Sequence, residues 1–354
     1  TVSDDEIYHE TRRAKFYTMK YGPFLVGTSR PETKLGDTAV AVHPDDERYK
    51  DAVGKTVTLP LIRREVPIVA DEGVELEFGT GAVKVTPAHD PLDFEISQRH
   101  NLPAVKVIDT EAAITRAGGE FFGQDRFEAR EAVRHELNKQ GYIEKVEDHH
   151  HSVGHCSRCG TVVEPMLSLQ WFVKVGPLVG PAVAPIKDGR ARYVPQRWEN
   201  NYFRWMENLR DWCISRQLWW GHRIPAWYCD DCDEIHVTVE APDACKSCGG
   251  SNLRQDQDVL DTWFSSQLWP FSTMGWPEAT ADLAKFYPTD VLVTAYDIIY
   301  FWVARMMMMG VHFTDREPFQ DIVIHGLVRA ADGRKMSKSI GNAIDPFDVA
   351  DQYG

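Results

Sequence analysis

Short runs that alternate apolar and polar residues fill the first part of the chain. Runs such as KFYTMKY, FLVGTSR, TAVAVH and VPIVAD have the two-residue period of half-buried strands, and Gly, Pro and Asp separate them. A later helical pattern, DRFEAREAVRHELNKQG, places Ala129, Val133 and Leu137 on one stripe and ends at Gly141. The pattern predicts a compact β-barrel-like domain with packed helices over residues 1–150.

Longer apolar runs replace this pattern towards the end of the chain. The strand-like VLVTAYD is followed by the helical IIYFWVARMMMMGVHF and by a second apolar strand, DIVIHGLV. This order is the βαβ rhythm of a parallel sheet. Between the two regions lie a Trp- and Arg-rich stretch and a short cysteine-rich module. We therefore expect an α/β multi-domain chain divided into residues 1–150, 151–227, 228–252 and 253–354.

Composition and charge limit the class of protein. Of the 354 residues, 43% are hydrophobic and 26% are charged, which are globular values. The net charge of −14 argues against a protein that coats nucleic acid, but it allows a local basic groove on an acidic body. No apolar run approaches about 18 residues and no signal peptide is evident, so we expect a cytoplasmic protein without membrane contact. Since the chain begins without Met and stops after DVADQYG, we expect both ends to be cuts in a longer protein.

Six of the seven cysteines lie in close CxxC pairs. Two pairs, separated by twelve residues, match a closed tetrahedral structural zinc site, and the short link between them would need the metal to fold. The proposed ligands are Cys229, Cys232, Cys245 and Cys248. The third pair, Cys156 and Cys159, is half of such a site. Either His151 or His155 completes it, or it stays empty.

A loop with two lysines, GRKMSKSIGN at residues 333–342, directly follows DIVIHGLV. Lys335 and Lys338 flank two hydroxyl residues, and such a loop can place ammonium groups over a triphosphate. There they would stabilise the charge that develops on a leaving pyrophosphate. For an arbitrary K-x-S-K string, a solvated basic turn is the better interpretation.

KMSKS is, however, the signature loop of class I aminoacyl-tRNA synthetases, and the chain resembles the valine-type members of that family. DVLDTWFSS, TAYDIIYFWVARMMMMG and WCISRQLWWGHRIPAW extend the resemblance over essentially the whole length. It implies a β-barrel-like editing domain inserted in a Rossmann-type parallel-sheet catalytic domain, with a small zinc module. It also implies a monomer that uses valine, tRNA(Val), ATP and Mg²⁺ and that carries structural Zn²⁺.

The resemblance implies roles for individual residues of the catalytic part. Lys335 and Lys338 would be catalytic, with Lys338 on the ATP phosphates. The other proposed ATP-binding residues are Asp297, which would hold the ribose, His325 and Gly326. The side-chain pocket for valine would be lined by Trp263, Ile298 and Trp302. Without the resemblance, these three apolar residues are better explained as ordinary core.

Two further strings, GTSRPETKLGDTAVAVHP and FGTGAVKVTPAHDPLDFE, resemble the editing domain of the valine, isoleucine and leucine members of the family. Asp93, with Asp90, would hold the α-ammonium of the substrate, although the two could equally cap a helix. Lys84 and Arg30 would lie near the terminal nucleotide or the ester oxygen. Thr86 and Thr33 would bind the ester or the threonine hydroxyl. The proposed editing residues are Thr28, Arg30, Thr33, Lys84, Thr86, Asp90 and Asp93.

An editing pocket is needed because a binding site cannot distinguish two amino acids of nearly the same shape. An apolar valine site cannot strongly reject threonine, and this enzyme and substrate pair is the standard example of that limit. We therefore expect an ATP-dependent valine–tRNA ligase that hydrolyses mischarged Thr-tRNA, by direct attack of water because no nucleophilic triad is evident. No HxGH-type motif occurs, so this chain alone is expected at most to edit. An isoleucine-type synthetase and a non-catalytic tRNA-binding fragment are the alternatives.

Overall fold

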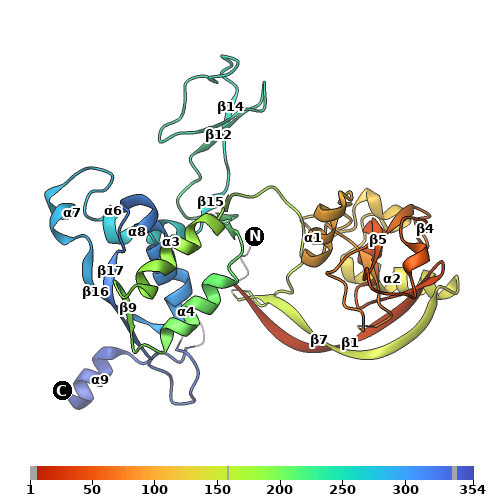
Figure 1. Cartoon of the computed structure of the whole chain (residues 1–354), viewed down its shortest axis with the longest axis horizontal. Coiled ribbons are helices and arrows are strands. Elements are labelled where there is room, and N and C mark those ends of the chain that lie inside the picture. The colour runs from red at the N-terminus through yellow and green to blue at the C-terminus, as the bar shows by residue number, and fades with distance from the viewer. Residues whose placement is uncertain (1–5, 78, 158, 337–340) are drawn as a thin grey trace. The chain divides into compact units, whose positions relative to one another are not determined.

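Two compact units make up the chain (Figure 1). The computed structural model describes residues 6–77, 79–157, 159–336 and 341–354. The N-terminal unit comprises residues 2–169 and the C-terminal unit comprises residues 170–354. The division into four parts expected from the sequence stays a prediction. Strand β7 (Ile143–Cys156) runs across its first boundary, at residue 150.

The strands of the N-terminal unit form two sheets. In the first, β1 (Ile7–Tyr21) pairs antiparallel with both β2 (Phe24–Thr28) and β7. The second has the order β4-β5-β3-β6, in which β3 and β5 are parallel and the other pairs are antiparallel. Its strands are β3 (Ala39–Val42), β4 (Thr56–Thr58), β5 (Glu65–Ala70) and β6 (Ala82–Val85). The expected strands are present, but the described residues do not show a closed barrel.

Two α-helices of this unit, α1 (Pro91–His100) and α2 (Arg126–Lys139), each begin after an aspartate. The carboxylates of Asp90 and Asp125 accept hydrogen bonds from backbone N–H groups of the first turn, as N-caps do. The stripe expected on α2 is confirmed, because its members are fully buried: Ala129, Val133 and Leu137. The shorter 3₁₀ helices are η2 (Pro31–Gly36), η3 (Lys50–Ala52) and η4 (Arg116–Phe121).

A three-stranded parallel sheet organises the C-terminal unit, in the order β16 (Thr289–Ala295), β17 (Phe319–His325) and β9 (Arg192–Val194). Helix α8 (Ala304–Thr314) connects β16 to β17, and its row of methionines, residues 306–309, is buried. The parallel β–α–β order expected from the apolar runs is therefore confirmed.

Shorter elements surround this sheet. The helices are α3 (Gly176–Lys187), α4 (Trp198–Glu207), α5 (Thr262–Ser266), α6 (Trp269–Ser272), α7 (Ala281–Phe286) and α9 (Pro346–Tyr353). Two antiparallel pairs are β8 (Phe172–Val173) with β10 (Trp212–Cys213), and β11 (Ser215–Arg216) with β15 (Val259–Leu260). The cysteine module is a small antiparallel sheet of β13 (Ile235–Val237), β12 (Ala226–Cys229) and β14 (Leu253–Gln255).

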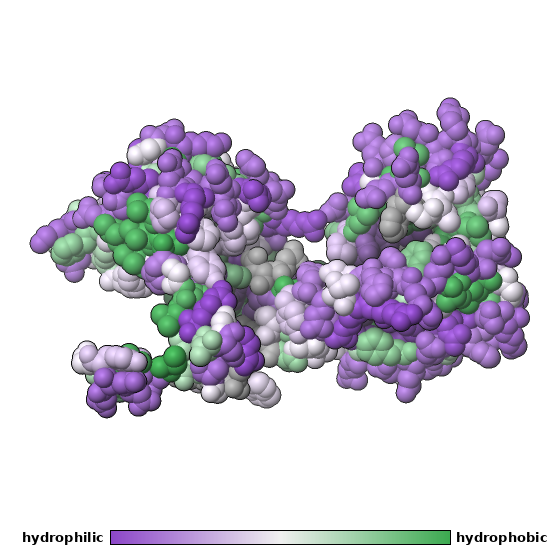
Figure 2. Space-filling view, turned by 90° about the horizontal axis from the view of Figure 1, so that it is seen from below, coloured by the Kyte–Doolittle hydropathy of each residue, from purple (hydrophilic) through white to green (hydrophobic). Residues whose placement is uncertain are grey.

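Each unit has a hydrophobic core of its own. Tyr21, Phe24 and Leu35 belong to the core of the N-terminal unit, and Tyr193 and Ile322 belong to that of the C-terminal unit. Figure 2 shows hydrophilic residues over much of the visible surface, with apolar residues in separate patches. Among the described residues, no helix combines the length and the apolar character needed to cross a bilayer.

A buried carboxylate, Asp261, gathers several donors inside the C-terminal unit. It accepts hydrogen bonds from the Trp212 indole N–H at 3.1 Å and from Arg216 Nη2 at 2.7 Å. Arg305 Nη1 lies 3.9 Å from the same carboxylate, and the Arg305 guanidinium lies 3.7 Å from the centroid of the Trp212 ring. Asp261 also caps α5 by accepting from the backbone N–H of Trp263 at 3.0 Å. The Asp261 side chain therefore connects the start of α5 with the β10–β11 region and with α8.

We expect Asp261→Asn to destabilise the C-terminal unit by about 3 kcal/mol, because two buried guanidinium groups lose their shared anion. Urea unfolding followed by tryptophan fluorescence measures the loss. The matched control is Asp321→Asn, whose partner Arg192 is exposed, and it should cost less than about 1 kcal/mol. Equal losses in the two variants would contradict the role given to the buried cluster.

Candidate functional site

A buried hydrogen-bonded group surrounds Asp37 in the N-terminal unit. The register of β3 and β6 pairs Ala39 with Val85, so residue 86 comes opposite residue 38 and close to Asp37 at the end of these strands. Thr86 Oγ1 donates to Asp37 Oδ1 at 2.6 Å, and the Tyr21 hydroxyl donates to Asp37 Oδ2 at 2.6 Å. Lys84 Nζ donates to Thr86 Oγ1 at 2.6 Å and lies 3.7 Å from Asp37 Oδ1. We call Tyr21, Asp37, Lys84 and Thr86 the Asp37 cluster.

Asp93 adjoins this cluster from the first turn of α1. Its Oδ2 accepts a hydrogen bond from the backbone N–H of Thr86 at 2.8 Å, and the residue is only 5% exposed. Burial raises the pKa of Asp93 to about 7, although the nearby Lys84 ammonium opposes the shift. Asp90 is the N-cap of α1, so the capping interpretation holds for Asp90, whereas Asp93 points its carboxylate at the Asp37 cluster.

A second group forms around the turn that leads into η2. The Thr28 hydroxyl accepts from the backbone N–H of Arg30 at 3.0 Å, and the Thr33 hydroxyl donates to the carbonyl of Arg30 at 3.0 Å. The Arg30 guanidinium donates to the carbonyl of His89 at 3.2 Å and forms ion pairs with Glu32 and Glu164. In this structure the guanidinium of Arg30 is therefore already held by partners of the same unit.

His89 lies between the two groups and is neutral. Its Nε2 accepts from the backbone N–H groups of Val107 at 2.9 Å and Ile108 at 3.3 Å, so the ring proton is on Nδ1, which donates to the carbonyl of Pro165 at 3.2 Å. Burial, the largest cause, and the charges of Arg30 and Lys84 together lower its pKa to about 4, although the hydrogen bond to Pro165 opposes the shift. Because both nitrogens are occupied, His89 shapes the site and is not available as a general base.

The structure thus brings together most of the residues expected from the sequence. Lys84, Thr86 and Asp93 meet at the Asp37 cluster, whereas Thr28, Thr33 and Arg30 form the neighbouring turn. Asp37 and Tyr21 were not among the residues predicted from the sequence. No local sequence pattern indicated Asp37, because Lys84 and Thr86 come close to it only through the pairing of β3 with β6.

The carboxyl ends of the parallel strands gather polar residues in the C-terminal unit. Ala295, at the end of β16, pairs with His325, at the end of β17. Asp297 follows β16 and accepts from Lys335 Nζ at 2.6 Å, whereas Gly326 directly follows β17. Ligands of open α/β sheets bind at this edge of the strands, so its polar residues suit a nucleotide. Lys338 lies outside the described residues.

The residues expected to line an apolar pocket lie on neighbouring elements. Trp263, on α5, stacks on Phe301 with ring centroids 5.5 Å apart. The indole N–H of Trp302 donates to the carbonyl of Ser266 on α5 at 3.1 Å. Ile298 ends the 3₁₀ helix η5 (Tyr296–Ile298), directly before the π-helical turn η6 (Ile299–Val303) that carries Trp302. All three expected residues are half-buried, which distinguishes them from fully buried core.

Four cysteine side chains converge in the small antiparallel module. Their sulfur atoms all lie within 4.8 Å of one another, with Cys229 and Cys248 at 3.6 Å and Cys232 and Cys245 also at 3.6 Å. Tetrahedral Zn–S bonds of about 2.3 Å require sulfur atoms at about this separation. The set therefore fits a structural zinc ion. His236 Nε2 lies 3.3 Å from Cys245 Sγ, where its N–H can donate to a metal-bound thiolate.

The third cysteine pair has no such set around it. Cys156 ends β7, and Cys159 donates to the Thr161 hydroxyl at 3.3 Å. Among the residues that the structure describes, no further His, Cys or carboxylate completes a group of three with this pair. The nearby His155 is buried and stacks on Tyr8 at 5.4 Å.

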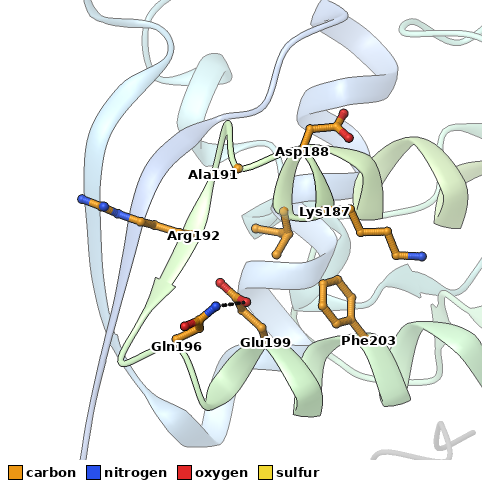
Figure 3. A pocket seen from close by; sticks show the side chains of 9 residues that line it. Lys187, Asp188, Ala191, Arg192, Gln196, Glu199 and Phe203 are labelled. Atoms are coloured by element: carbon orange, nitrogen blue, oxygen red, sulfur yellow. Dashed lines mark hydrogen bonds between the residues drawn. The ribbon is translucent and has the colours of Figure 1, made fainter.

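A surface hollow of about 470 Å³ lies between α3, β9 and α4 of the C-terminal unit (Figure 3). Lys187, Asp188 and Glu199 contribute charge to its wall, and the Lys187 ammonium lies 5.9 Å from the centroid of the Phe203 ring. None of the residues expected to bind a substrate lines this hollow. The candidate sites are therefore the Asp37 cluster and the edge of the parallel sheet.

Comparisons with known proteins identify the family of the chain. The sequence family described as tRNA synthetases class I (I, L, M and V) matches residues 3–354. A valine–tRNA ligase of Thermotoga maritima is 58% identical over 359 residues, which cover 100% of this chain and 42% of that protein. A valine–tRNA ligase of Geobacter sulfurreducens is 60% identical over 360 residues, which cover 100% of this chain and 41% of that protein. The chain thus spans about two fifths of the length of the curated relatives that it matches.

Removal of one thiolate should release the metal from the cysteine module. We expect the purified chain to hold about one zinc ion, and Cys232→Ser to lose it, because three thiolates and a hydroxyl bind zinc weakly. Zinc content after gel filtration, determined with a colorimetric chelator, measures this. Cys213→Ser is the matched control, since Cys213 lies outside the group, and it should keep its zinc. Equal zinc content in both variants would refute the ligand set.

Asp93→Asn should change how stability depends on pH. A carboxyl whose pKa is raised from about 4 in the unfolded chain to about 7 binds its proton more tightly when folded. It therefore costs stability progressively as pH rises from about 4 to about 7, and the full cost is present above pH 7. Relative to the unsubstituted chain, Asp93→Asn should gain stability between pH 5 and pH 8 in thermal unfolding. A difference that is independent of pH would contradict the burial of this charge.

Proposed function

The chain belongs to the class I tRNA synthetase family, and from this premise we propose that it is part of a valine–tRNA ligase whose N-terminal unit hydrolyses mischarged Thr-tRNA. The identity of 58–60% to two valine–tRNA ligases supports the choice of amino acid. The observation that carries the hydrolytic function is that Lys84, Asp93 and buried Asp37 all hydrogen-bond to Thr86.

The direction of the hydrogen bonds in the Asp37 cluster explains how threonine is recognised in this proposal. An ionised carboxylate can only accept hydrogen bonds, so the Thr86 hydroxyl must be the donor in its hydrogen bond to Asp37. One lone pair of Thr86 Oγ1 accepts from Lys84, which leaves the second to accept from a substrate; because Thr86 is fully buried, neighbouring side chains must move for the substrate to reach it. The hydroxyl of threonine can donate to it, whereas the methyl group of valine cannot. A site that hydrogen-bonds a substrate hydroxyl strongly rejects an analogue that lacks this hydroxyl. An apolar pocket rejects an analogue with an added hydroxyl only weakly.

Asp93 would bind the α-ammonium of the aminoacyl ester. Its pKa of about 7 leaves the free carboxyl partly protonated at neutral pH, and an approaching cation favours the ionised form. Binding of the ammonium group therefore promotes ionisation of Asp93, and the resulting carboxylate attracts the ammonium. Asp90, which caps α1 beside Asp93, adds a second negative charge at the same helix end.

Lys84 would stabilise the reaction itself. Its ammonium has three N–H donors, of which Thr86 takes one, and the others can reach the ester carbonyl oxygen as negative charge develops there. Water attacks the ester carbon, and the terminal ribose oxygen leaves with a proton from that water. Arg30 would approach the terminal nucleotide only by exchanging one of its present partners, Glu32 or Glu164.

The C-terminal unit would belong to the ATP-dependent part of the same enzyme. In this proposal Asp297, His325, Gly326 and the KMSKS lysines bind ATP with Mg²⁺, and Trp263, Ile298 and Trp302 select valine. The four cysteines hold structural Zn²⁺, and tRNA(Val) is the nucleic-acid partner. The sheets of the N-terminal unit would correspond to the barrel-like editing domain, and the parallel sheet would correspond to the Rossmann-type catalytic domain.

The chain should hydrolyse Thr-tRNA, and Asp93→Ala should slow that reaction. We expect a loss on the order of hundredfold, the scale of a lost charge-assisted contact to the substrate. The measurement is the release of labelled threonine from Thr-tRNA. Asp45→Ala, at a largely exposed aspartate of the same unit, is the matched control and should keep the original rate.

Two outcomes would contradict this assignment. Equal hydrolysis by Asp93→Ala and the unsubstituted chain would remove Asp93 from the site. Binding of Thr-tRNA without any release of threonine would instead favour the alternative of a non-catalytic tRNA-binding fragment.

A further inference from the structure

Lys34 is a fully buried lysine to which the proposed mechanism gives no role. It belongs to η2, and its ammonium donates to the carbonyl of Pro60 at 2.7 Å and lies 5.2 Å from the centroid of the Tyr21 ring. Burial lowers the pKa of Lys34 to about 8, and attraction to Asp37 opposes that shift. A buried charge is expensive unless something nearby compensates for it, so the residue needs an explanation.

Tyr21 connects this ammonium to the Asp37 cluster. The face of its ring lies towards Lys34, and its hydroxyl donates to Asp37 Oδ2 at 2.6 Å. A cation over an aromatic ring draws electron density towards itself, which makes the phenol O–H a stronger donor. Lys34 thus acts on Asp37 both directly, through charge, and through Tyr21.

The charged and titratable groups that face Lys34 come from several elements. Tyr21 belongs to β1, Asp37 follows η2, and Lys84 on β6 is a second cation that repels Lys34. Arg64, just before β5, donates to the backbone carbonyl of Asp37 at 3.0 Å. Asp37 therefore has cationic side chains from several elements near it, and Lys34 is a fully buried one.

We propose that Lys34 is a positioning residue of the hydrolytic pocket: it holds Tyr21 and Asp37 so that Thr86 keeps its free lone pair directed at the substrate. This inference rests on the proposed hydrolysis of Thr-tRNA. Lys34 touches neither water nor ester, and its effect passes through two hydrogen bonds of 2.6 Å, from Tyr21 to Asp37 and from Thr86 to Asp37. Its removal should therefore slow the bound reaction more than it weakens binding.

Lys34→Met keeps a long side chain but removes the charge. We expect kcat for Thr-tRNA hydrolysis to fall about tenfold, since misaligned groups are costly in the transition state, whereas KM changes little. The matched control is Lys55→Met, the same substitution at an exposed lysine of the same unit, and it should leave both constants unchanged. Equal kcat values for the two variants would overturn the proposal.

Tyr21→Phe tests whether Lys34 acts through the Asp37 cluster, because it removes only the hydroxyl that donates to Asp37. If both residues act on one carboxylate, the losses in kcat from Lys34→Met and Tyr21→Phe should not add in the double variant. Additive losses in kcat would contradict the proposal, and so would variants that lower thermal stability without lowering kcat. Lys34 would then have only a structural role, as the hydrogen-bond donor to the carbonyl of Pro60.

A titration that needs no substrate separates this inference from the proposed function. In the Asp37→Asn variant, Lys34 loses its attractive partner, so nuclear magnetic resonance of its side-chain nitrogen should show a pKa below the original value of about 8. An unchanged pKa would show that Lys34 does not act on Asp37. If the unsubstituted chain failed to hydrolyse Thr-tRNA, the proposed function would fall, but this titration would still decide the coupling.

Discussion

A carboxylate buried away from water must receive hydrogen bonds from the chain itself, and at Asp37 this requirement organises the Asp37 cluster. Asp37 is fully buried and accepts from two hydroxyl groups, those of Tyr21 and Thr86. Because the carboxylate can only accept, the proton positions of both hydroxyls follow from it. The orientation of Thr86, and with it the contact that Thr86 can offer a substrate, is a consequence of satisfying one buried charge.

In the proposed function, each unit selects the amino acid in a different way. The half-buried side chains of Trp263, Ile298 and Trp302 would select an aliphatic side chain by size, which cannot exclude a hydroxyl of similar shape. The Asp37 cluster would instead select by a hydrogen bond that only the hydroxylated amino acid can make. The buried charge of Asp93 lowers the stability of the folded chain at neutral pH, a cost that is explained if the carboxylate binds an ammonium group.

Features set by local sequence could be predicted, and those set by distant contacts could not. CxxC spacing places cysteine pairs on tight turns, so the four-cysteine group was correctly predicted, and the stripe on α2 depends on helical period alone. Asp37, by contrast, meets partners 16 and 49 residues away: the pairing of β3 with β6 brings Thr86 to it, and Tyr21 comes from β1 of the other sheet. For Arg30 the sequence showed a cation, but it could not show that Glu32 and Glu164 already hold it. A β-barrel-like domain was expected; the described strands form two sheets and do not show a barrel, and alternation alone identifies strands without stating which of them pair.

The most direct test of the central role of Asp37 is the rate at which Asp37→Asn releases threonine from Thr-tRNA. An amide of the same size can accept at one position only, so it cannot hold both hydroxyls as the carboxylate does. We expect a loss on the order of hundredfold in a chain whose circular dichroism is unchanged. Hydrolysis at the original rate by a folded Asp37→Asn chain would contradict it.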